Sequence, residues 1–225
     1  KNGQGLIDLV EGICAAAPGC RVRLGSLEPR TITEDFCRRA AALPNLCPHF
    51  HLSMQSGCDA TLKRMNRKYD SERYYESVKL LRGHFDRPGI TTDLIVGFPG
   101  ETEEEFAQTL DFVRKCAFSA LHIFPYSRRS GTPAASMPGQ VPRTEKEERA
   151  HRAAEVAAEL RAAWLAGGIG RTAPVLFEEE KNGLWRGHAP DYTEVYAEGV
   201  GLHNVIKTVE MTEIHENGWR GSVVK

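Results

Sequence analysis

The sequence predicts an α/β domain built on a parallel sheet, followed by a small all-β barrel. Three observations carry this prediction. Apolar runs typical of buried strands alternate with segments of helical periodicity as far as about residue 166, and a glycine-rich break follows at 167–170. The remaining residues hold only short β-type runs separated by turn signals. We therefore predict two domains, 1–169 and 170–225.

The elements of the first domain follow from periodicity and capping signals. Apolar residues at helical spacing predict a helix over 6–16, and Thr31-x-x-Glu34 and Thr102-x-x-Glu105 are capping boxes that begin two others. The near-continuous apolar run 90–96 is typical of a strand buried on both faces. The expected order is helix 6–16, strand 21–24, helix 31–43, strand 49–54, helix 71–82 capped by Ser71, strand 90–96, helix 102–116, strand 120–124 and helix 144–166.

The second domain is predicted from β-type runs at 174–177, 193–197, 205–212 and 219–224. Asn182-Gly183 and Asn217-Gly218 are turn signals between them. Four or five short strands in about 55 residues fit a small β-barrel of the kind used by oligonucleotide-binding modules.

Composition excludes several functional classes. The chain has 225 residues, of which 41% are hydrophobic and 26% charged, as in a soluble globular protein. The net charge of −1 excludes a scaffold that holds nucleic acid by bulk charge, so any such site must be a local patch. No apolar run reaches the length of a membrane span, so we expect no membrane partner. The start, Lys-Asn-Gly-Gln-Gly, leads us to expect a chain that begins inside a longer protein.

The cysteines and histidines predict no metal site. The six cysteines are scattered singly, without C-x-x-C spacing, which favours reduced thiols and a cytoplasmic location. His49 and His51 alternate on one strand face and form a possible ligand pair, but we expect no metal there. We expect His122 to be a packed strand residue.

The loops after the predicted strands are the first functional signal. In parallel sheets, ligands bind at the carboxyl ends of the strands. The loops at 25–28, 55–57, 97–101 and 126–128 are rich in glycine or polar residues. Each loop alone can be a structural turn, whereas four loops at one edge favour a site.

Two regions are candidates for RNA contact. Lys63, Arg64, Arg67 and Lys68 crowd four cations into six positions, which is either a phosphate-binding patch or a solvated helix face. Residues 171–225 hold nine acidic and six basic residues, a net charge of −3. RNA binding there must use one face; the candidate residues are Trp185, Arg186, His188 and Tyr192. Alternatively, these aromatic residues form the core of the barrel.

Together these motifs resemble the radical S-adenosylmethionine (SAM) methylthiotransferases over essentially the whole chain. The resemblance rests on Arg-Leu-Gly-Ser-Leu-Glu-Pro (23–29), Leu-Cys-Pro-His-Phe-His-Leu-Ser-Met-Gln-Ser-Gly (46–57), Leu-Lys-Arg-Met-Asn-Arg-Lys-Tyr (62–69), Thr-Thr-Asp-Leu-Ile-Val-Gly-Phe-Pro-Gly-Glu-Thr (91–102) and His-Ile-Phe-Pro-Tyr-Ser-Arg-Arg-Ser-Gly-Thr (122–132). Residues 171–225 resemble the small RNA-binding barrel, called TRAM and similar to an OB-fold, that ends these enzymes.

The resemblance implies a fold and a set of site residues. The fold is an incomplete TIM-like (β/α) barrel of the radical SAM type followed by the TRAM barrel. The implied SAM-binding residues are Ser26, Glu28, Gln55, Ser56, Gly97, Phe98, Pro99, Gly100, Phe124 and Tyr126. The implied RNA-binding residues are Lys63, Arg64, Arg67, Lys68, Arg128, Arg129, Trp185, Arg186, His188 and Tyr192. Alternatively, Gln55 and Ser56 only satisfy turn amides.

The resemblance also implies an activity and its cofactors. Whole enzymes of this family use SAM and two 4Fe–4S clusters. This sequence has no C-x-x-x-C-x-x-C cluster loop, so we expect residues 1–225 alone to hold no cluster and to be inactive. The Ser-Leu-Glu-Pro and Cys-Pro-His-Phe-His variants most resemble the branch that methylthiolates C2 of threonylcarbamoyladenosine beside the tRNA anticodon.

Three alternatives stay open. The chain can belong to the branch that acts on isopentenyladenosine, to the branch that acts on a ribosomal protein, or to a non-catalytic RNA-binding relative. The expected partners are the tRNA anticodon loop and SAM. We also expect dimerisation through the exposed edges of the partial barrel.

Overall fold

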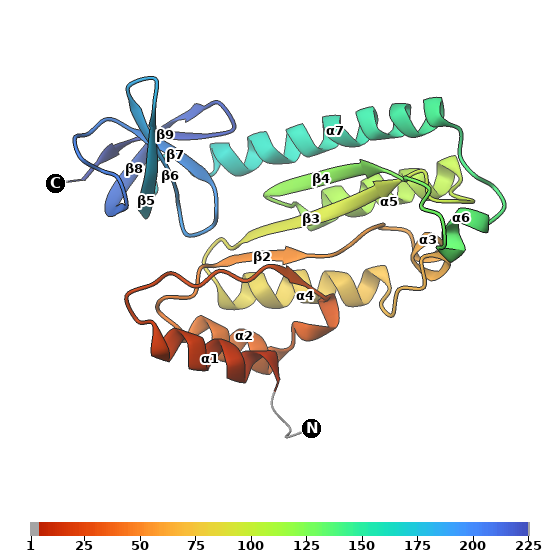
Figure 1. Cartoon of the computed structure of the whole chain (residues 1–225), viewed down its shortest axis with the longest axis horizontal. Helices are drawn as coiled ribbons and strands as arrows, with labels where there is room; N and C mark the ends of the chain where they lie inside the picture. Colours follow the sequence, from red (N-terminus) through yellow and green to blue (C-terminus); the bar gives the residue numbers. More distant parts are fainter. Residues whose placement is uncertain (1–4, 225) are drawn as a thin grey trace.

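The computed structural model describes residues 5–224, which form two units joined by a long helix (Figure 1). No helix in this range is long and apolar enough to span a membrane. The α/β unit contains α1 (Leu6–Ala16), β1 (Ser26–Leu27), the 3-10 helix η1 (Pro29–Thr31), α2 (Glu34–Ala41), β2 (His49–Leu52), α3 (Asp59–Arg64), α4 (Ser71–His84), β3 (Gly89–Val96), α5 (Glu103–Cys116), β4 (Ala120–Pro125), α6 (Pro133–Ser136) and α7 (Arg143–Ala166).

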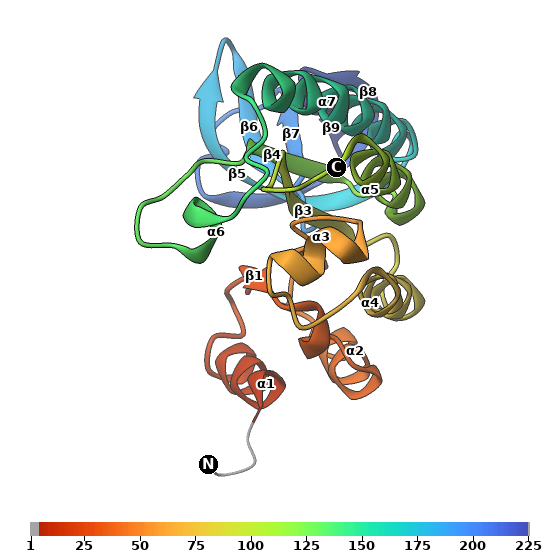
Figure 2. The ribbon, with the colours of Figure 1, turned by 90° about the vertical axis from the view of Figure 1, so that its right-hand side faces the viewer.

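The four strands form one open, fully parallel sheet in the order β1-β2-β3-β4. The long ladder between β3 and β4 pairs Thr91 with Ala120 through to Val96 with Pro125. Helices α2, α4, α5 and α7 lie along one side of this sheet (Figure 2). The prediction of an incomplete α/β barrel is therefore confirmed. Dimerisation through the edges β1 and β4 stays a prediction.

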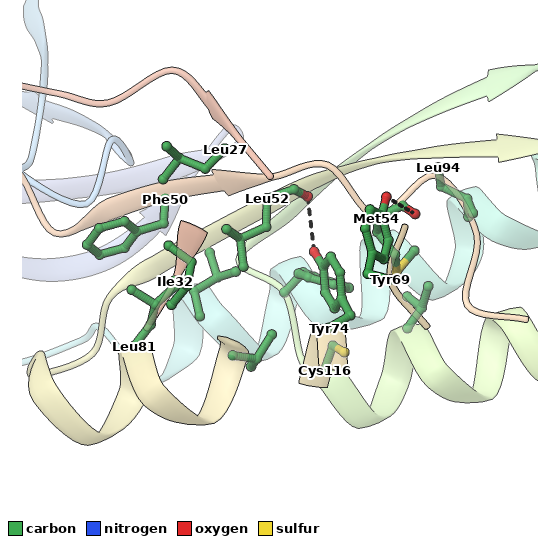
Figure 3. Close-up of a cluster of buried hydrophobic side chains, with 14 of the residues drawn as sticks. Leu27, Ile32, Phe50, Leu52, Met54, Tyr69, Tyr74, Leu81, Leu94 and Cys116 are labelled. Carbon is green, nitrogen blue, oxygen red and sulfur yellow. Dashed lines mark hydrogen bonds between the residues drawn. The ribbon is translucent and has the colours of Figure 1, made fainter. Parts of the chain in front are cut away.

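The main core lies between the sheet and its helices (Figure 3). Phe50, Leu52 and Leu94 point from the strands to the helices and are fully buried. Tyr74 of α4 is buried among them, and its hydroxyl donates to the Leu52 carbonyl over 3.0 Å. Burying each such side chain stabilises the fold by about 1.5–3 kcal/mol. Because strand residues alternate, this packing turns the neighbours of these residues to the opposite, concave face.

The second unit is a closed five-stranded barrel with the strand order β5-β6-β7-β9-β8. Its strands are β5 (Thr172–Lys181), β6 (Leu184–His188), β7 (Glu194–Ala197), β8 (Val205–His215) and β9 (Gly218–Val223). Trp219, Val175 and Phe177 fill its interior together with Leu165 from the end of α7. The predicted small β-barrel is confirmed. Its second strand, β6, has no apolar run and was not predicted from the sequence.

The β-barrel lies at the amino ends of the parallel strands, whose arrowheads point away from it (Figure 1). Two arginines of the α/β unit, one before β3 and one on α7, hold the β-barrel in this position. Arg87 donates to the Trp164 carbonyl and its guanidinium lies 3.7 Å from the Trp164 ring, while Arg161 donates to the carbonyls of Ser119 and Asn217. A side chain at Gly89, the first residue of β3, would collide with the barrel turn at the Asp191 carbonyl.

Several predicted boundaries were wrong. Residues 21–24 form no strand; Val22 makes one isolated bridge to Leu46, and the edge strand is Ser26–Leu27. Thr31 does not cap the second helix, because it lies in the 3-10 turn begun by Pro29. Thr33 is the cap instead, and its hydroxyl accepts from the Phe36 amide.

Two other caps also differ from the prediction. Asp70, one residue before Ser71, caps α4, because its carboxylate accepts from the Arg73 amide. Helix α7 begins at Arg143, one residue before the predicted Thr144, and Pro142 precedes it without a side-chain cap. A proline at the start of a helix needs no capping partner for its own nitrogen.

Candidate functional site

The turn after β3 is a glycine turn held in one conformation. Gly97 and Gly100 have φ angles of +70° and +76°, a region that favours glycine. A side chain at Gly97 would collide with Lys146 of α7. The Gly97 amide donates to the Glu101 carboxylate over 2.6 Å, and the Gly100 amide donates to the Gly139 carbonyl over 2.8 Å. With these donors engaged, the turn offers a ligand mainly carbonyl acceptors and apolar surface.

A buried ion pair holds this turn against α7. Arg149 donates to the Glu101 carboxylate over 2.9 Å and to the Glu101 carbonyl over 3.1 Å. Both side chains are almost completely buried, with 3% and 1% of their surface exposed. Burial raises the pKa of Glu101, while the Gly97 amide and Arg149 act in the opposite direction. Because arginine does not deprotonate in proteins, the guanidinium keeps Glu101 as a carboxylate.

Aromatic side chains border the turn. The rings of Phe98 and Tyr126 meet edge to face with their centroids 5.3 Å apart. The Tyr126 carbonyl accepts from the Lys146 ammonium over 3.0 Å. The Tyr126 hydroxyl is buried without a hydrogen-bond partner among the described residues. Phe124, at the end of β4, is 51% exposed, so an apolar surface remains open beside the turn.

The other predicted SAM residues lie in separate places. Ser26 is exposed in β1 and lines a cavity on the same side of the sheet as His51 and Asp93. Gln55 extends the ladder between β2 and β3 through its backbone, with a φ of +68°. Ser56 is fully buried; its hydroxyl bonds to the Thr109 hydroxyl over 3.2 Å and accepts from the Cys58 amide. Ser56 therefore has the turn-satisfying role of the alternative hypothesis. Glu28 is exposed and lies 3.4 Å from Arg30.

The predicted RNA-binding cations of the α/β unit gather at the carboxyl ends of the strands. Lys63, Arg67, Arg128 and Arg129 are exposed, and no carboxylate of residues 5–224 lies within ion-pair distance of them. Lys68 is also exposed and donates to Asn66 over 2.7 Å. Arg64 differs, because it forms a bidentate pair with Glu105.

The predicted RNA-binding residues of the β-barrel lie at the other end of the sheet, and most are already engaged. Arg186 pairs with Glu179 and Glu194. Two other predicted RNA-binding residues make one polar contact each. Trp185 donates to the Gly199 carbonyl, and His188 pairs with Glu178.

Tyr192 faces the α/β unit. Its ring stacks on His188 at 4.6 Å and carries the Arg23 guanidinium 3.8 Å from its centre. The two predicted RNA-binding groups therefore do not form one surface.

The thiols do not form a cluster-binding set. All six cysteines are free, and burial raises the pKa of Cys37 to about 11 and that of Cys116 to about 12. A thiol that stays protonated is a poor ligand for iron. Within residues 5–224, no group of three histidine, cysteine or acidic side chains could hold a metal ion.

Two features of the site were not predicted from the sequence. One is the clamp formed by Lys146 and Arg149, which lie more than 45 positions after the turn that they hold. The other is a polar row on the concave face of the sheet, where His51 contacts Thr91 and Asp93. The signal for this row was present, because 49, 51, 91 and 93 alternate on two strands that pair in register. His122 also faces this side and is exposed, contrary to the prediction.

Comparisons with known proteins agree with this architecture. The radical SAM superfamily matches residues 4–113. Among solved structures, coproporphyrinogen III oxidase from Escherichia coli, described as a radical SAM enzyme, aligns with a TM-score of 0.55 and 20% identity. That alignment covers 70% of this chain and 37% of the other.

Curated relatives extend the likeness to both units. A tRNA-2-methylthio-N(6)-dimethylallyladenosine synthase from Endomicrobium trichonymphae is 37% identical over 208 residues, covering 91% of this chain and 49% of that protein. The protein of the same name from Acidothermus cellulolyticus is 51% identical over 122 residues, covering 54% of this chain and 24% of that protein. The chain thus spans half or less of the length of these relatives.

These relatives correct the predicted branch. The motif variants at 26–29 and 47–51 predicted the threonylcarbamoyladenosine branch, whereas these relatives are named for dimethylallyladenosine, the isopentenyl alternative. The structure gives a physical reason for the error. Leu27 and Phe50 are buried in the core between the sheet and the helices, and Cys47 is also buried, so much of these motifs reflects packing rather than substrate contact.

Proposed function

We propose that the chain belongs to the radical SAM methylthiotransferases and contributes the SAM-binding turn and the RNA-binding surface of a tRNA methylthiotransferase. The substrate that we propose is N6-dimethylallyladenosine beside the anticodon. The observation that carries this proposal is the 208-residue match to a synthase of that name, because it runs through both the α/β unit and the β-barrel.

The glycine turn supports the proposed binding of SAM. A ligand with a flat heterocycle and an exocyclic amino group needs acceptors and an apolar surface, and the turn and Phe124 supply both. SAM would bring the methyl group and the radical chemistry. The chain's own residues would bind and orient it: Arg149 fixes Glu101, and Glu101 fixes the Gly97 amide.

The iron–sulfur clusters of the family do not fit the described residues. The buried thiols of Cys37 and Cys116 stay protonated, and the described cysteines form no three-ligand set. We therefore assign no step of the reaction to a cluster held by residues 5–224.

The exposed cations at the carboxyl ends of the strands support the proposed RNA contact. Lys63 and Arg67 follow β2 and Arg128 follows β4, so all three lie at the same edge as the glycine turn. A phosphate chain bound there would place its bases next to the proposed SAM site.

The test is nucleoside mass spectrometry of tRNA from a strain that lacks the parent gene. We expect selective loss of 2-methylthio-N6-dimethylallyladenosine and its restoration by the full-length gene. A gene limited to residues 1–225 should restore nothing. Loss of the threonylcarbamoyl derivative instead, or an unchanged nucleoside profile, would contradict the proposed substrate.

A further inference from the structure

The segment between β4 and α7 is attached to the glycine turn at both of its ends. We call residues 127–138 the strap; it contains the short helix α6. Just before the strap, the Tyr126 amide donates to the Val96 carbonyl over 2.8 Å. Just after it, the Gly139 carbonyl accepts from the Gly100 amide over 2.8 Å. Because Val96 and Gly100 flank the glycine turn, the strap leaves the sheet and rejoins it at the same place.

The strap projects toward the concave side of the sheet. Figure 2 shows α6 on the side of the sheet opposite α4 and α5. Within the strap only Ala135 is buried, and nearly all the other residues are exposed. A segment that buries so little surface gains little stability from packing, so it can move at a small cost in free energy.

The hydrogen bonds of the strap stay within the segment. The Thr132 hydroxyl donates to the Arg129 carbonyl over 2.8 Å. The Gln140 side-chain amide donates to the carbonyls of Ala134 and Met137 over 2.9 Å and 3.0 Å. Among the described residues, no hydrogen bond joins the strap to a residue outside 127–140. The strap is therefore braced internally and can move as one piece.

The two attachment points define where the chain can bend. The Tyr126 carbonyl accepts from the Lys146 ammonium over 3.0 Å, so the first bend follows Tyr126. Gly139 has a φ of +72°, which glycine adopts readily, and it forms the second bend. A few loop residues that absorb the change in backbone angles are sufficient for closure of a loop over a site.

Unpaired cations lie on the strap and on the rigid part of the molecule beside it. Arg128 and Arg129 are exposed at the start of the strap, and Lys63 and Arg67 are exposed at the same edge of the sheet. Within residues 5–224 no carboxylate lies within ion-pair distance of these four side chains. Helix α3, which carries Lys63, is fixed to α5 by the bidentate pair of Arg64. One pair of cations is therefore movable and the other is fixed.

We propose that the strap is a clamp that closes over single-stranded RNA bound at the carboxyl end of the sheet. Arg128 and Arg129 hold the phosphate chain from the moving side, and Lys63 and Arg67 hold it from the fixed side. This inference rests on the proposed RNA contact and adds a movement to it. Because a closed clamp must open before RNA leaves, it slows dissociation much more than it changes association.

Hydrogen exchange tests the movement. Exchange of residues 1–225 is measured by mass spectrometry with and without a ten-nucleotide oligoadenylate at low salt, and fluorescence anisotropy confirms that the RNA is bound. Closure should slow exchange of the amides of 133–138 by about tenfold or more, although the two arginines of the strap lie outside this segment. RNA that only touches Arg128 and Arg129 would slow exchange at 127–130 alone.

A variant of the strap tests its effect on RNA release. Residues 131–138 are replaced by a glycine–serine sequence of the same length, which removes α6 and the internal brace but keeps Arg128 and Arg129. Stopped-flow anisotropy should show RNA dissociating about tenfold faster, with the association rate changed by less than about twofold. Val200→Ser is the control, because Val200 is 97% exposed in a loop of the β-barrel, and it should change neither rate.

Urea unfolding checks that both variants are folded, and the results separate the clamp from the RNA contact on which it rests. If RNA binds without slowing exchange at 133–138, or if the folded strap variant releases RNA at the unchanged rate, the clamp is wrong and the proposed RNA contact stands. If residues 1–225 bind no RNA at low salt, the clamp and the proposed RNA contact are both overturned.

Discussion

The two ends of the parallel sheet both carry basic side chains, but they use them differently. At the carboxyl end, Lys63, Arg67 and Arg128 extend into solvent without a carboxylate partner among the described residues. At the amino end, Arg87 binds a backbone carbonyl and Arg186 is paired with two glutamates. The first arrangement leaves charge available for an anionic ligand, and the second uses charge to hold the protein's own parts together.

This difference shows that a count of charges does not locate a phosphate site. Residues 171–225 have a net charge of −3, and their cations are largely neutralised by neighbours, such as Arg220 by Glu198 and Glu213. Near the glycine turn, Arg64 and Arg149 are also paired with glutamates, but no carboxylate of residues 5–224 lies within ion-pair distance of Lys63, Arg67, Arg128 or Arg129. The sheet's carboxyl end is therefore where we expect RNA backbone to gain most from counterion release.

The largest effect that we expect comes from breaking the clamp at the carboxyl end. Arg149→Met leaves the Glu101 carboxylate buried without its cation and should destabilise the protein by about 3–5 kcal/mol. It should also loosen the turn at Gly97. Urea unfolding measures the first effect, and the affinity for SAM in the full-length enzyme measures the second.

Arg152→Met is the matched control for the clamp. It is also an arginine of α7 paired with a glutamate, but its side chain is 36% exposed. Such a pair contributes about 0–1 kcal/mol, so its loss should be small. Equal destabilisation by the two changes would contradict the role that we give to burial of Arg149.

The next largest effect that we expect is on RNA binding, and it distinguishes the carboxyl end of the sheet from the amino end. Replacing Lys63, Arg67, Arg128 and Arg129 together by alanine should weaken binding of single-stranded RNA by about a hundredfold at low salt and lower the slope of log affinity against log salt by about 3. Fluorescence anisotropy at several salt concentrations measures both. The comparison would fail if Arg186→Ala and Arg220→Ala, made together in the β-barrel, reduced the slope by more than the quadruple change.

Much of this fold could be predicted from sequence because its signals are local. The capping box at Thr102 and the apolar run of β3 depend on neighbouring residues, and the structure has both. β6 could not be found this way: Gly187 is packed against the β5 backbone, so closure of the barrel rather than an apolar pattern makes the strand.

The site was predictable only in part for the same reason. The glycine turn is a local motif, and it could be named from residues 97–100. The Arg149 clamp and the contact of Arg23 with Tyr192 join residues far apart in the chain, and no spacing rule indicates them. The roles of Ser56 and Arg186 likewise depend on neighbours, Thr109 and Glu194, that only the folded chain brings close.

The smallest effect that we expect tests the amino end through pH. The pKa of His49 is lowered from 6.5 to about 4, mainly by burial and then by Arg23. Between these two pH values the unfolded chain binds a proton that the folded chain does not bind, so stability falls as pH decreases through this window and is fully retained above 6.5. We expect the free energy of unfolding to fall by about 2 kcal/mol, which is less than the whole lowering of the His49 pKa would give.

Urea unfolding between pH 7 and pH 4.5 measures this loss as a difference between variants. His49→Gln cannot take up the proton, so its stability should fall less steeply, and the gap between the two curves isolates His49 from other groups that titrate. His151→Gln removes a histidine that is 77% exposed on α7 and should leave the curve of the unchanged protein as it is. Parallel curves for His49→Gln and the unchanged protein would mean that His49 takes up its proton in the folded state as readily as in the unfolded chain. The contact between Arg23 and His49 Nδ1 could not then be a hydrogen bond donated by Arg23 at low pH, because a protonated His49 has no acceptor nitrogen.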